Sequence, residues 1–537
     1  MDVHNNVAHT IVRQLKTWGI DVVFGVVGDA VIPLVDALDA AEGIRFSPAR
    51  REDAAACMAS AYAKLTGKPG VCIGTSGPGA VNLLNGVADA AQDRVPLVVI
   101  TGQVDSIYVG TAYKQYFDHQ TLFRSFAAYS AQLASPGAAA EVVNRALKTA
   151  VAGCRVTHVS VPRDLFSAPA PAAVRPPEPY LQTPARSPEN VLAAAADILN
   201  RAEKPVILAG RGTRGLTSEV LELAEKLGAG VMYTLPATGV IPFEHPLALG
   251  GLGLAGKETA ANALARADLC LMIGANWWPK EYAPSNVPVV QVDLAPENIG
   301  VQTPVAFGVV GNAAAVVPYL SARLNRAPNP EWTGYIGQLR AHWQQLMVRE
   351  TGADSSPTAP QRLVRDIQNT IAPDAVIALD VGDHVVWFAR VFEPVSQDVL
   401  VSGRWRSMGF GLPAGLAAKM AAPQRQVVVF AGDGGFAMSM AEFSTAVQYK
   451  LPVTVVVANN GTLAMEKNRM LVGGYRPSGV DLANPDFAAY ARSAGGLGLR
   501  VERPGELPGA LAEALYSGRP ALVDVLTAAP VPPGTKP

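Results

Sequence analysis

The hydrophobic residues of this chain follow two alternating patterns, short apolar runs and longer stretches with helical spacing. Near the N-terminus, Val7, Ile11 and Leu15 are four residues apart, which predicts the buried stripe of a helix. The next run, Asp21–Val27, is nearly continuous in apolar residues and predicts a buried strand. The same alternation continues along the chain. Strands that alternate with helices predict an α/β fold made of doubly wound parallel sheets.

One stretch near the C-terminus combines this pattern with polar residues. Val427–Phe430 predicts a strand, Gly432–Gly435 a tight turn into one helix, and Val453–Val457 a second buried strand. A right-handed crossover brings the carboxyl ends of both strands to the same edge of the sheet. Asp433 and Asn460 follow these two strand ends, so we expect them to lie close together.

The residue types at this edge suit a metal ion and a phosphate. Asp433 and Asn460 provide hard oxygen ligands, and a glycine-rich turn at a helix start exposes backbone N–H groups. This combination predicts Mg²⁺ or Ca²⁺ that bridges the protein to a phosphorylated ligand. The alternative is a glycine turn and an asparagine-containing loop without any ligand.

A weaker copy of the same pattern occurs in the N-terminal part. Gly77-Pro78-Gly79 is followed by a helical pattern, then by Arg94-Val95-Pro96 and an apolar run, as Gly432–Gly434 is followed by Lys450-Leu451-Pro452. We expect two related α/β modules, one at each end of the chain. Chance similarity of two βαβ units is the alternative.

Proline-rich stretches divide the chain. The prolines that follow Pro162 predict one linker, and those between Pro328 and Pro360 predict a second. These linkers predict domains at residues 1–170, 185–330 and 355–537. Ser187 is expected to cap the first helix of the middle domain, with Pro188 at its first position.

The middle domain contains a formal GxGxxG motif, Gly210–Gly215, directly after an apolar run. The residues about twenty positions further on, which would have to hold a ribose, contain no Asp or Glu. NAD binding is therefore disfavoured, and a plain tight turn is the leading interpretation.

Composition narrows the classes of function. The chain has 537 residues, of which 49% are hydrophobic and 17% charged, so it can bury large cores. A net charge of −1 gives no strong attraction to nucleic acid or to membranes. The four cysteines form no CxxC pair and are expected to be reduced thiols. Without a signal-peptide pattern or a membrane-length apolar run, a cytoplasmic protein without a stable membrane anchor is expected.

The motifs of the whole chain resemble those of thiamine diphosphate (ThDP) enzymes of the pyruvate oxidase and acetolactate synthase family. The resemblance is carried, in chain order, by GVVGDAVIPLVDAL, RREDAAACMASAYAKLTG, SGPGAVNLLNGVADA, DVGDHVVWFAR, RSMGFGLPAGLAAK and GDGGF with the later NN. It implies three doubly wound domains: a Pyr domain at 1–170, a central domain at 185–330 that is a candidate for binding FAD, and a PP domain at 355–537.

The resemblance assigns catalytic roles to two residues. Glu52 would hydrogen-bond N1′ of the aminopyrimidine and promote loss of the C2 proton; the alternative is an ordinary acid at a helix start. Gln115 would lie near the substrate. The sequence departs from the family at the position next to each of these residues. Arg51, before Glu52, replaces a histidine, and Tyr116, after Gln115, replaces a glutamate.

The resemblance also implies a set of cofactor contacts. Mg²⁺ would be held by Asp433, Asn460 and the backbone carbonyl of Thr462. Met408 would support the bent conformation of ThDP, with ordinary core packing as the alternative. The other contacts implied for ThDP are Gly28, Gly77, Gly382, His384, Gly432, Gly434 and Gly435, and those for FAD are Gly212, Asn276 and Asp293.

The implied reaction is ThDP- and Mg²⁺-dependent decarboxylation of a small 2-oxoacid, pyruvate above all, with transfer of electrons to FAD. The alternatives are a carboligase of the acetolactate synthase type, an acetyltransferase of the sulfoacetaldehyde type, and a non-catalytic protein of the same fold. Met465 resembles acetolactate synthases, whereas Arg469 departs from both groups and would favour a doubly charged anion unless it is simply a solvated helix residue. Relatives build the site from two subunits, so a homodimer at least, and a homotetramer by analogy, is expected.

Overall fold

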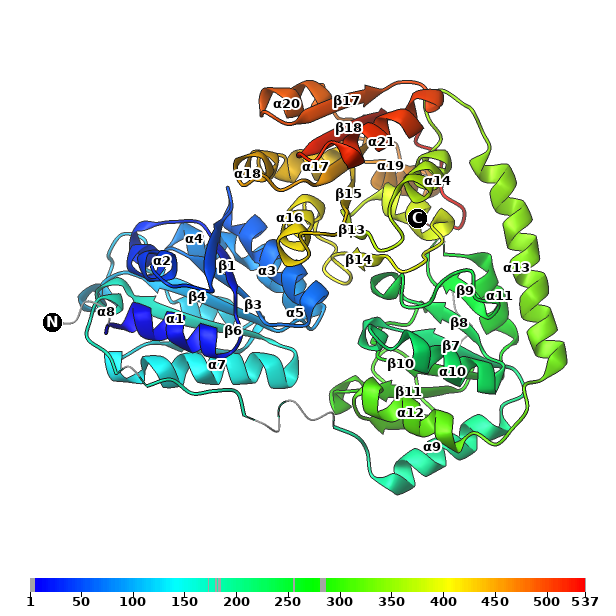
Figure 1. The fold of residues 1–537 in the computed structure, drawn as a ribbon, viewed down its shortest axis with the longest axis horizontal. Coiled ribbons are helices and arrows are strands. Elements are labelled where there is room, and N and C mark those ends of the chain that lie inside the picture. Colours follow the sequence, from blue (N-terminus) through cyan, green and yellow to red (C-terminus); the bar gives the residue numbers. More distant parts are fainter. Residues whose placement is uncertain are drawn as a thin grey trace.

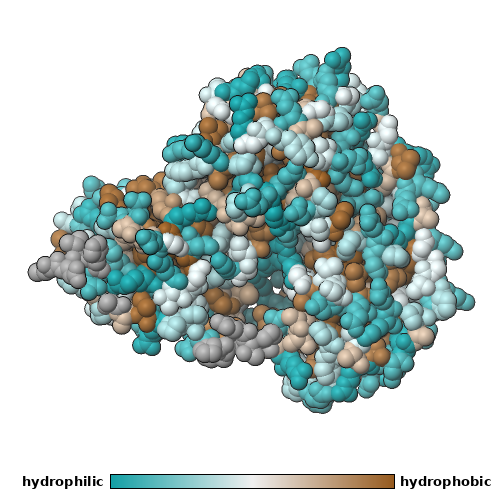
Figure 2. Space-filling model, in the orientation of Figure 1, coloured by the Kyte–Doolittle hydropathy of each residue, from teal (hydrophilic) through white to brown (hydrophobic). Residues whose placement is uncertain are grey.

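The computed structural model describes residues 5–171, 173–178, 181, 185–254, 256–280 and 286–536. These residues form three modules, each built on a six-stranded parallel sheet flanked by helices (Figure 1). The three-domain α/β architecture expected from the sequence is therefore confirmed. Figure 2 shows that this face of the molecule is hollowed between the N-terminal module and the other two.

The N-terminal module has the strand order β2-β1-β3-β4-β6-β5. Its strands are β1 (Val22–Gly25), β2 (Arg45–Pro48), β3 (Gly70–Gly74), β4 (Leu97–Gln103), β5 (Ala127–Gln132) and β6 (Val156–Pro162). Its α-helices are α1 (Val7–Thr17), α2 (Ile32–Asp39), α3 (Glu52–Thr66), α4 (Pro78–Asn82), α5 (Leu84–Gln92), α6 (His119–Phe123), α7 (Ala139–Gly153) and α8 (Arg163–Phe166).

The central module has the strand order β12-β11-β10-β7-β8-β9. Its strands are β7 (Pro205–Ala209), β8 (Gly230–Tyr233), β9 (Ala248–Gly251), β10 (Leu269–Ile273), β11 (Val289–Asp293) and β12 (Phe307–Val310). Its helices are α9 (Glu189–Arg201), α10 (Thr217–Leu227), α11 (Glu258–Arg266) and α12 (Ala313–Arg323). The long helix α13 (Pro330–Thr351) leads along its side to the C-terminal module (Figure 1).

The C-terminal module has the strand order β14-β13-β15-β16-β18-β17. Its strands are β13 (Val376–Leu379), β14 (Asp398–Leu400), β15 (Val427–Gly432), β16 (Thr454–Asn459), β17 (Leu497–Val501) and β18 (Ala521–Leu526). Its helices are α14 (Pro360–Thr370), α15 (Asp383–Val391), α16 (Gly411–Ala421), α17 (Asp433–Ser439), α18 (Glu442–Gln448), α19 (Ala464–Val472), α20 (Phe487–Ser493) and α21 (Leu507–Tyr516).

The two terminal modules share one relative strand order, which agrees with the internal repeat expected from the sequence. The C-terminal sheet is buried on both faces. Val427 and Val429 of β15 join a core that contains α3 of the N-terminal module, whereas Val428 and Phe430 join a core shared with the central module. Because successive side chains of a strand point to opposite faces, a continuous apolar run is what such a strand requires.

Two local expectations were wrong. Helix α17 begins at Asp433, inside the segment expected to be a turn, and a second helix, α18, follows where one helix was expected. Between the two helices the carbonyl of Met440 accepts hydrogen bonds from the Phe443 N–H, three residues on, and from the Tyr490 hydroxyl. Ser187 does not cap α9, since its hydroxyl donates to the carbonyl of Val310 and Pro188 occupies the N-cap position.

In the part of the chain that the structure describes, no helix is both long and apolar enough to cross a bilayer.

Candidate active site

The carboxyl ends of β15 and β16 form a polar cradle around Asp433. The two strands pair in parallel with Gly432 opposite Ala458, so the loops that follow them are neighbours. Asp433 is buried and accepts hydrogen bonds from the N–H groups of Gly434 (2.9 Å) and Gly461 (2.7 Å) and from the Asn484 amide (2.8 Å). Burial raises the pKa of Asp433. The carboxylate is thus held in one place beside the loop that carries Asn460.

The two asparagines at the end of β16 have different roles. Asn459 is buried and donates to Asp524 (2.9 Å), so it is structural. Asn460 faces its own loop, where its side-chain oxygen accepts from the Thr462 N–H (3.2 Å). A carboxylate, an amide oxygen and a main-chain carbonyl are the hard donors that Mg²⁺ prefers. No cluster of three or more His, Cys, Asp or Glu side chains suited to a metal occurs among the described residues, so a metal here would depend on one carboxylate together with neutral amide and carbonyl oxygens.

The glycines next to the cradle make room for His384. A Cβ atom at Gly382 or at Gly432 would lie 3.1 Å from Nδ1 of its imidazole ring. The ring is buried, and its Nε2 has no hydrogen-bond partner among the described residues. Burial lowers the pKa of His384 to about 4, so the ring is neutral at pH 7. An orphaned buried ring nitrogen at a glycine-lined helix start fits an oxygen of a bound diphosphate.

Met408 and two further glycines complete this side. A Cβ at Gly434 would lie 3.4 Å from the terminal carbon of Met408, and one at Gly435 would lie 2.5 Å from an oxygen of Asp380. Asp380 is fully buried and accepts from the N–H groups of residues 381, 409 and 411, at 2.7, 2.9 and 3.0 Å. Burial raises its pKa to about 6. Sequence reasoning missed Asp380, although its place at the carboxyl end of β13 was a usable signal.

The site residues of the N-terminal module gather at the equivalent edge of their own sheet. Glu52 is the first residue of α3 and accepts from the Asn82 amide (3.1 Å). Gly77 has φ +65°, and a Cβ there would lie 2.9 Å from Cβ of Gln115, whose own φ is +63°. A Cβ at Gly28 would lie 2.5 Å from Cβ of Thr75, and one at Gly79 would meet both Thr75 and Glu52. Glu52, Gln115, Gly28 and Gly77 therefore belong to one cluster, here called the N-terminal cluster.

A carboxylate of the C-terminal module positions the start of α3. Glu442 is buried on α18, and one of its oxygens accepts from the N–H groups of Arg50 (2.8 Å) and Arg51 (3.3 Å), directly before Glu52. Burial raises the pKa of Glu442. Sequence reasoning missed this residue, because nothing in its local pattern shows that its partners lie on a distant segment.

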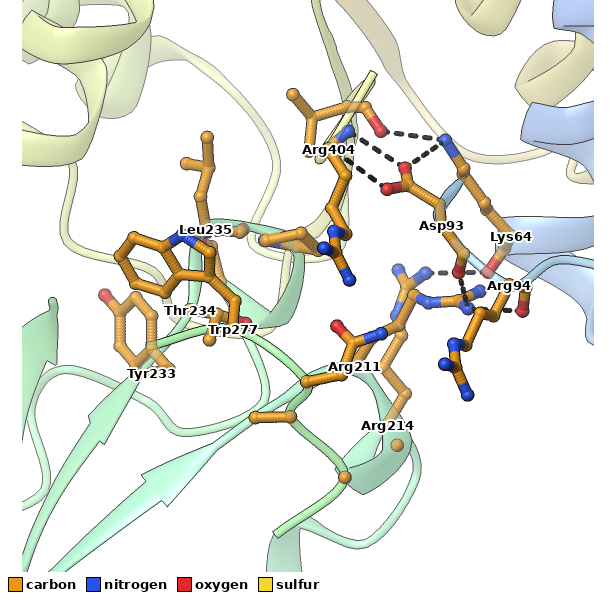
Figure 3. A pocket seen from close by; sticks show the side chains of 18 of the residues that line it. Lys64, Asp93, Arg94, Arg211, Arg214, Tyr233, Thr234, Leu235, Trp277 and Arg404 are labelled. Carbon is orange, nitrogen blue, oxygen red and sulfur yellow. Dashed lines mark hydrogen bonds and ion pairs between the residues drawn. The ribbon is translucent and has the colours of Figure 1, made fainter. Parts of the chain in front are cut away.

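A large cavity lies where the three modules meet (Figure 3). Its volume is about 1130 Å³, and its lining includes Gly212, Asn276 and Asp293 together with Gly382 and Met408 of the C-terminal module. Among the described residues that line it, none belongs to the N-terminal cluster. Within one chain, the predicted site residues thus form three groups: the N-terminal cluster, the cradle, whose members Gly382 and Met408 reach the cavity, and the central-module residues Gly212, Asn276 and Asp293, which line it.

The glycines of the GxGxxG motif have a packing role. A Cβ at Gly212 would lie 2.8 Å from Cα of Gly274, so the loops after β7 and β10 approach too closely for side chains there. Asp293 accepts from its own loop, from the Asn298 amide (2.7 Å) and the Ala295 N–H (2.9 Å). The tight-turn interpretation of the motif fits these contacts, and both glycine loops nevertheless line the cavity.

A polar junction closes one side of the cavity (Figure 3). The Lys64 ammonium donates to Asp93 (2.7 Å) and to the carbonyl of Val401 (3.0 Å), and Asp93 accepts the N–H of Arg404 (2.9 Å). Arg211 of the central module donates to the carbonyls of Asp93 and Arg94. Lys64 also pairs with Asp89 (2.6 Å), so a buried charge cluster joins the N-terminal and C-terminal modules, and Arg211 adds the central module through main-chain carbonyls.

Comparison with known proteins identifies the family. Three family models match: the N-terminal TPP binding domain of thiamine pyrophosphate enzymes at residues 5–122, their central domain at 192–320, and their C-terminal TPP binding domain at 380–525. The chain belongs to the thiamine pyrophosphate enzymes. Thiamine pyrophosphate is another name for ThDP, so both ThDP-binding domains are present in this chain.

Several curated relatives match along nearly their whole length. The chain is 37% identical to the "Putative thiamine pyrophosphate-containing protein YdaP" of Bacillus subtilis, over 97% of this chain and 92% of the relative. It is 32% identical to the acetolactate synthase large subunit of Corynebacterium glutamicum, over 97% and 86%. It is 29% identical to the pyruvate oxidase of Lactiplantibacillus plantarum, over 96% and 87%. A decarboxylase or carboligase that acts on 2-oxoacids fits these relatives.

Proposed function

We propose that this enzyme decarboxylates pyruvate with ThDP and Mg²⁺ and passes the electrons to FAD. The observation that carries the proposal is the single cavity that joins the cradle residues Gly382 and Met408 to the glycine loops of the central module. A cofactor bound to the cradle and a dinucleotide bound to the central module would then share one cavity, with no protein segment separating them. Sites that bind cofactors are concave and largely preformed, as this one is.

The residues of the cradle would divide the binding of ThDP among them. Asp433, Asn460 and the Thr462 carbonyl would hold Mg²⁺, and the Gly434 and Gly435 backbone with His384 would hold the diphosphate. Bound ThDP supplies an electron sink for the pair of electrons left when CO₂ departs. Glu52 would exchange a proton with N1′ of the aminopyrimidine, while Asn82 orients its carboxylate.

A second copy of the chain would complete the site. Apolar side chains are exposed beside both half-sites: Val27, Ile32 and Val81 near the N-terminal cluster, and Met438, Leu471 and Tyr475 on the segments around the cradle. Exposed apolar patches of this kind are typical of protein interfaces. A two-fold dimer would place the N-terminal cluster of one copy on the cradle of the other, and two such dimers would form the tetramer expected by analogy.

The size and charge of the cavity support FAD as its ligand. A volume of about 1130 Å³ exceeds that of ordinary drug-sized pockets, and basic side chains outnumber acidic ones in its lining. Gly212, Asn276 and Asp293 would lie along the flavin nucleotide. The visible spectrum of the purified protein, before and after FAD is added, tests this point directly.

A carboligase is the second candidate, because several relatives are named acetolactate synthases. Product analysis with pyruvate separates the two reactions. Reduction of an electron acceptor with release of CO₂ and acetate or acetyl phosphate supports the oxidase, whereas acetolactate without acceptor reduction supports the carboligase. Absence of CO₂ release from any 2-oxoacid would contradict both.

A further inference from the structure

The C-terminal side of the cavity carries three solvent-exposed arginines, and two of them, Arg404 and Arg406, pair with no carboxylate among the described residues. Arg404 and Arg406 precede Met408, and Arg469 lies on α19 one helical turn after Met465; all five side chains line the cavity. Among the described residues, Arg404 and Arg406 form no ion pair, and Arg469 has only Glu466 at 3.7 Å. In Figure 3 the Arg404 side chain extends into the cavity from the loop above it.

Two other arginines of the cavity, Arg211 and Arg214, are already used by the protein, whereas Arg94 lies on the N-terminal module, away from the C-terminal side of the cavity. Arg211 donates to main-chain carbonyls of the N-terminal module, and Arg214 donates to the Lys64 carbonyl and pairs with Asp398. These two arginines hold modules together. Arg404 and Arg406 have no such role for their guanidinium groups: Arg406 gives only its Nε hydrogen to the Gly403 carbonyl (2.9 Å).

The carboxylate that acts on Arg406 is also engaged, and Glu466, which lines the same cavity, lies 3.7 Å from Arg469. Asp93, the carboxylate that acts most directly on Arg406, accepts from the Lys64 ammonium and from the N–H groups of Gly403 and Arg404. Desolvation in the cavity lowers the pKa of Arg406, and the neighbouring charge of Arg469 lowers it further, whereas Asp93 raises it. Two like charges that share a recess favour an anion between them.

Arg406 is held in this position at a conformational cost. Its φ is +60°, the left-handed region that side chains other than glycine and asparagine rarely adopt. Such strain persists where the surrounding structure over-determines it, and it concentrates at functional sites. The strained backbone and the unpaired guanidinium are independent observations on one residue.

We propose that Arg406 and Arg469, assisted by Arg404, bind an oxyanion of the second reactant, the acceptor of the acyl group. The acceptor would be inorganic phosphate or a carbonyl compound that carries an anionic group, since both present the oxygens that a guanidinium binds through paired hydrogen bonds. The proposal rests on the proposed function, because it assigns the acceptor of that reaction. The site differs from the diphosphate cradle, which uses backbone N–H groups and His384.

The three arginines lie on the side of the cavity formed by the C-terminal module. They flank Met408 and Met465, whereas the glycine loops assigned to FAD belong to the central module. An acceptor that is held there would lie between the cradle and the central module. Flavin content therefore distinguishes an acceptor site from a flavin site.

Calorimetric titration of inorganic phosphate into the enzyme saturated with ThDP, Mg²⁺ and FAD tests the proposal. Saturation with ThDP keeps phosphate out of the cradle. The wild-type protein is expected to bind phosphate, and Arg406→Gln and Arg469→Gln are each expected to weaken binding about tenfold to a hundredfold. Lys467→Gln is the matched control, because Lys467 lies on the same helix, pairs with Asp481 and is not among the described residues lining the cavity.

Turnover measurements then separate the two sources of the oxyanion. Acetyl phosphate formation that depends on Arg406 and Arg469 identifies phosphate as the acceptor. Glyoxylate carries a carboxylate that acetaldehyde lacks. A preference of the wild type for glyoxylate that is lost in Arg469→Gln identifies an anionic carbonyl compound as the acceptor.

Two results would overturn the proposal. The first is that the wild type neither binds phosphate nor prefers an anionic acceptor. The same conclusion follows if phosphate affinity and acceptor preference are both unchanged in the two arginine variants. The second is loss of bound FAD in both variants, which would make the arginines flavin ligands. Failure of the proposed function would appear as absence of ThDP-dependent turnover of pyruvate. The phosphate titration does not depend on turnover, so the two failures can be distinguished.

Discussion

The N-terminal and C-terminal modules have the same strand order but different chemistry at the same edge of the sheet. In the C-terminal module, Asp433 and Asp380 are buried and bound by backbone N–H groups, and burial raises the pKa of both. In the N-terminal module, Glu52 is half-buried and is oriented by the Asn82 amide. The topology therefore decides where side chains meet, and the loops decide which chemistry they perform.

The difference matches two tasks. A metal and a diphosphate require fixed, dry ligands, which is how Asp433 is held. A proton-transfer group must be accessible to its partner, as Glu52 is at the first turn of α3. One module would anchor the cofactor and the other would activate it.

The largest expected effect is on turnover in Glu52→Gln. The amide keeps the shape of the side chain but cannot exchange the proton, so kcat should fall by about 10²- to 10⁴-fold. ThDP binding, measured by fluorescence titration, should be nearly unchanged. Asp53→Asn changes the adjacent acid of the same helix and should leave kcat within about twofold, which is the scale of an exposed ion pair. Equal losses of kcat in Glu52→Gln and Asp53→Asn would show that Glu52 has no specific part in the reaction.

Asp433→Ala should act on affinity instead. If Asp433 holds Mg²⁺ as proposed, loss of its buried carboxylate is expected to cost about 3 kcal/mol or more, which is roughly a hundredfold in the Kd of ThDP at fixed Mg²⁺. Asp481→Asn, which changes an exposed carboxylate near the same loop, is the control. Unchanged Mg²⁺ dependence in Asp433→Ala would show that the cradle does not hold the metal.

Asp380 predicts a specific pH dependence of stability. Its pKa is raised from 3.8 to about 6 by burial, so ionisation favours the unfolded chain. The contribution of Asp380 is fully present below about pH 4 and is lost as the pH rises to about 6, by roughly 3 kcal/mol. The unfolding free energy of the wild type minus that of Asp380→Asn should therefore fall by this amount between pH 4 and pH 7. A difference that is constant with pH would contradict the assignment.

Glu442→Gln should give the smallest effect. Both N–H groups go to one carboxylate oxygen, so the amide oxygen can still accept them, but a neutral amide is a weaker acceptor than a carboxylate; a loss of about 1–2 kcal/mol in stability and about tenfold in kcat is expected. ThDP affinity should stay the same, because the variant disturbs the start of α3 and not the cradle. Glu502→Gln, on an exposed carboxylate, is the control. A change in ThDP affinity without a change in kcat would place the role of Glu442 elsewhere.

The sequence predicted those features that follow from periodicity and from strand ends. The continuous apolar run Val427–Phe430 predicted a buried strand, and in the structure both faces of this strand are covered. The crossover rule correctly predicted that Asp433 and the Asn460 loop are neighbours. The place of Asp380 directly after β13 was a signal that went unused, whereas Glu442 could not be assigned in the same way, since its partners are backbone N–H groups of a distant segment. Ser187 shows the same limit, because a distant carbonyl outcompeted the helix end for its hydroxyl.

The most direct test of the divided site is a hybrid of two inactive variants. Chains with Glu52→Gln and chains with Asp433→Ala, carrying different affinity tags, are co-expressed, and the assemblies that contain both are purified. In a site shared between copies, one site of each hybrid dimer has neither change, so ThDP-dependent activity should return to about a quarter to a half of the wild-type value. A site formed within a single chain would leave every site defective, and hybrids as inactive as their parents would contradict the account.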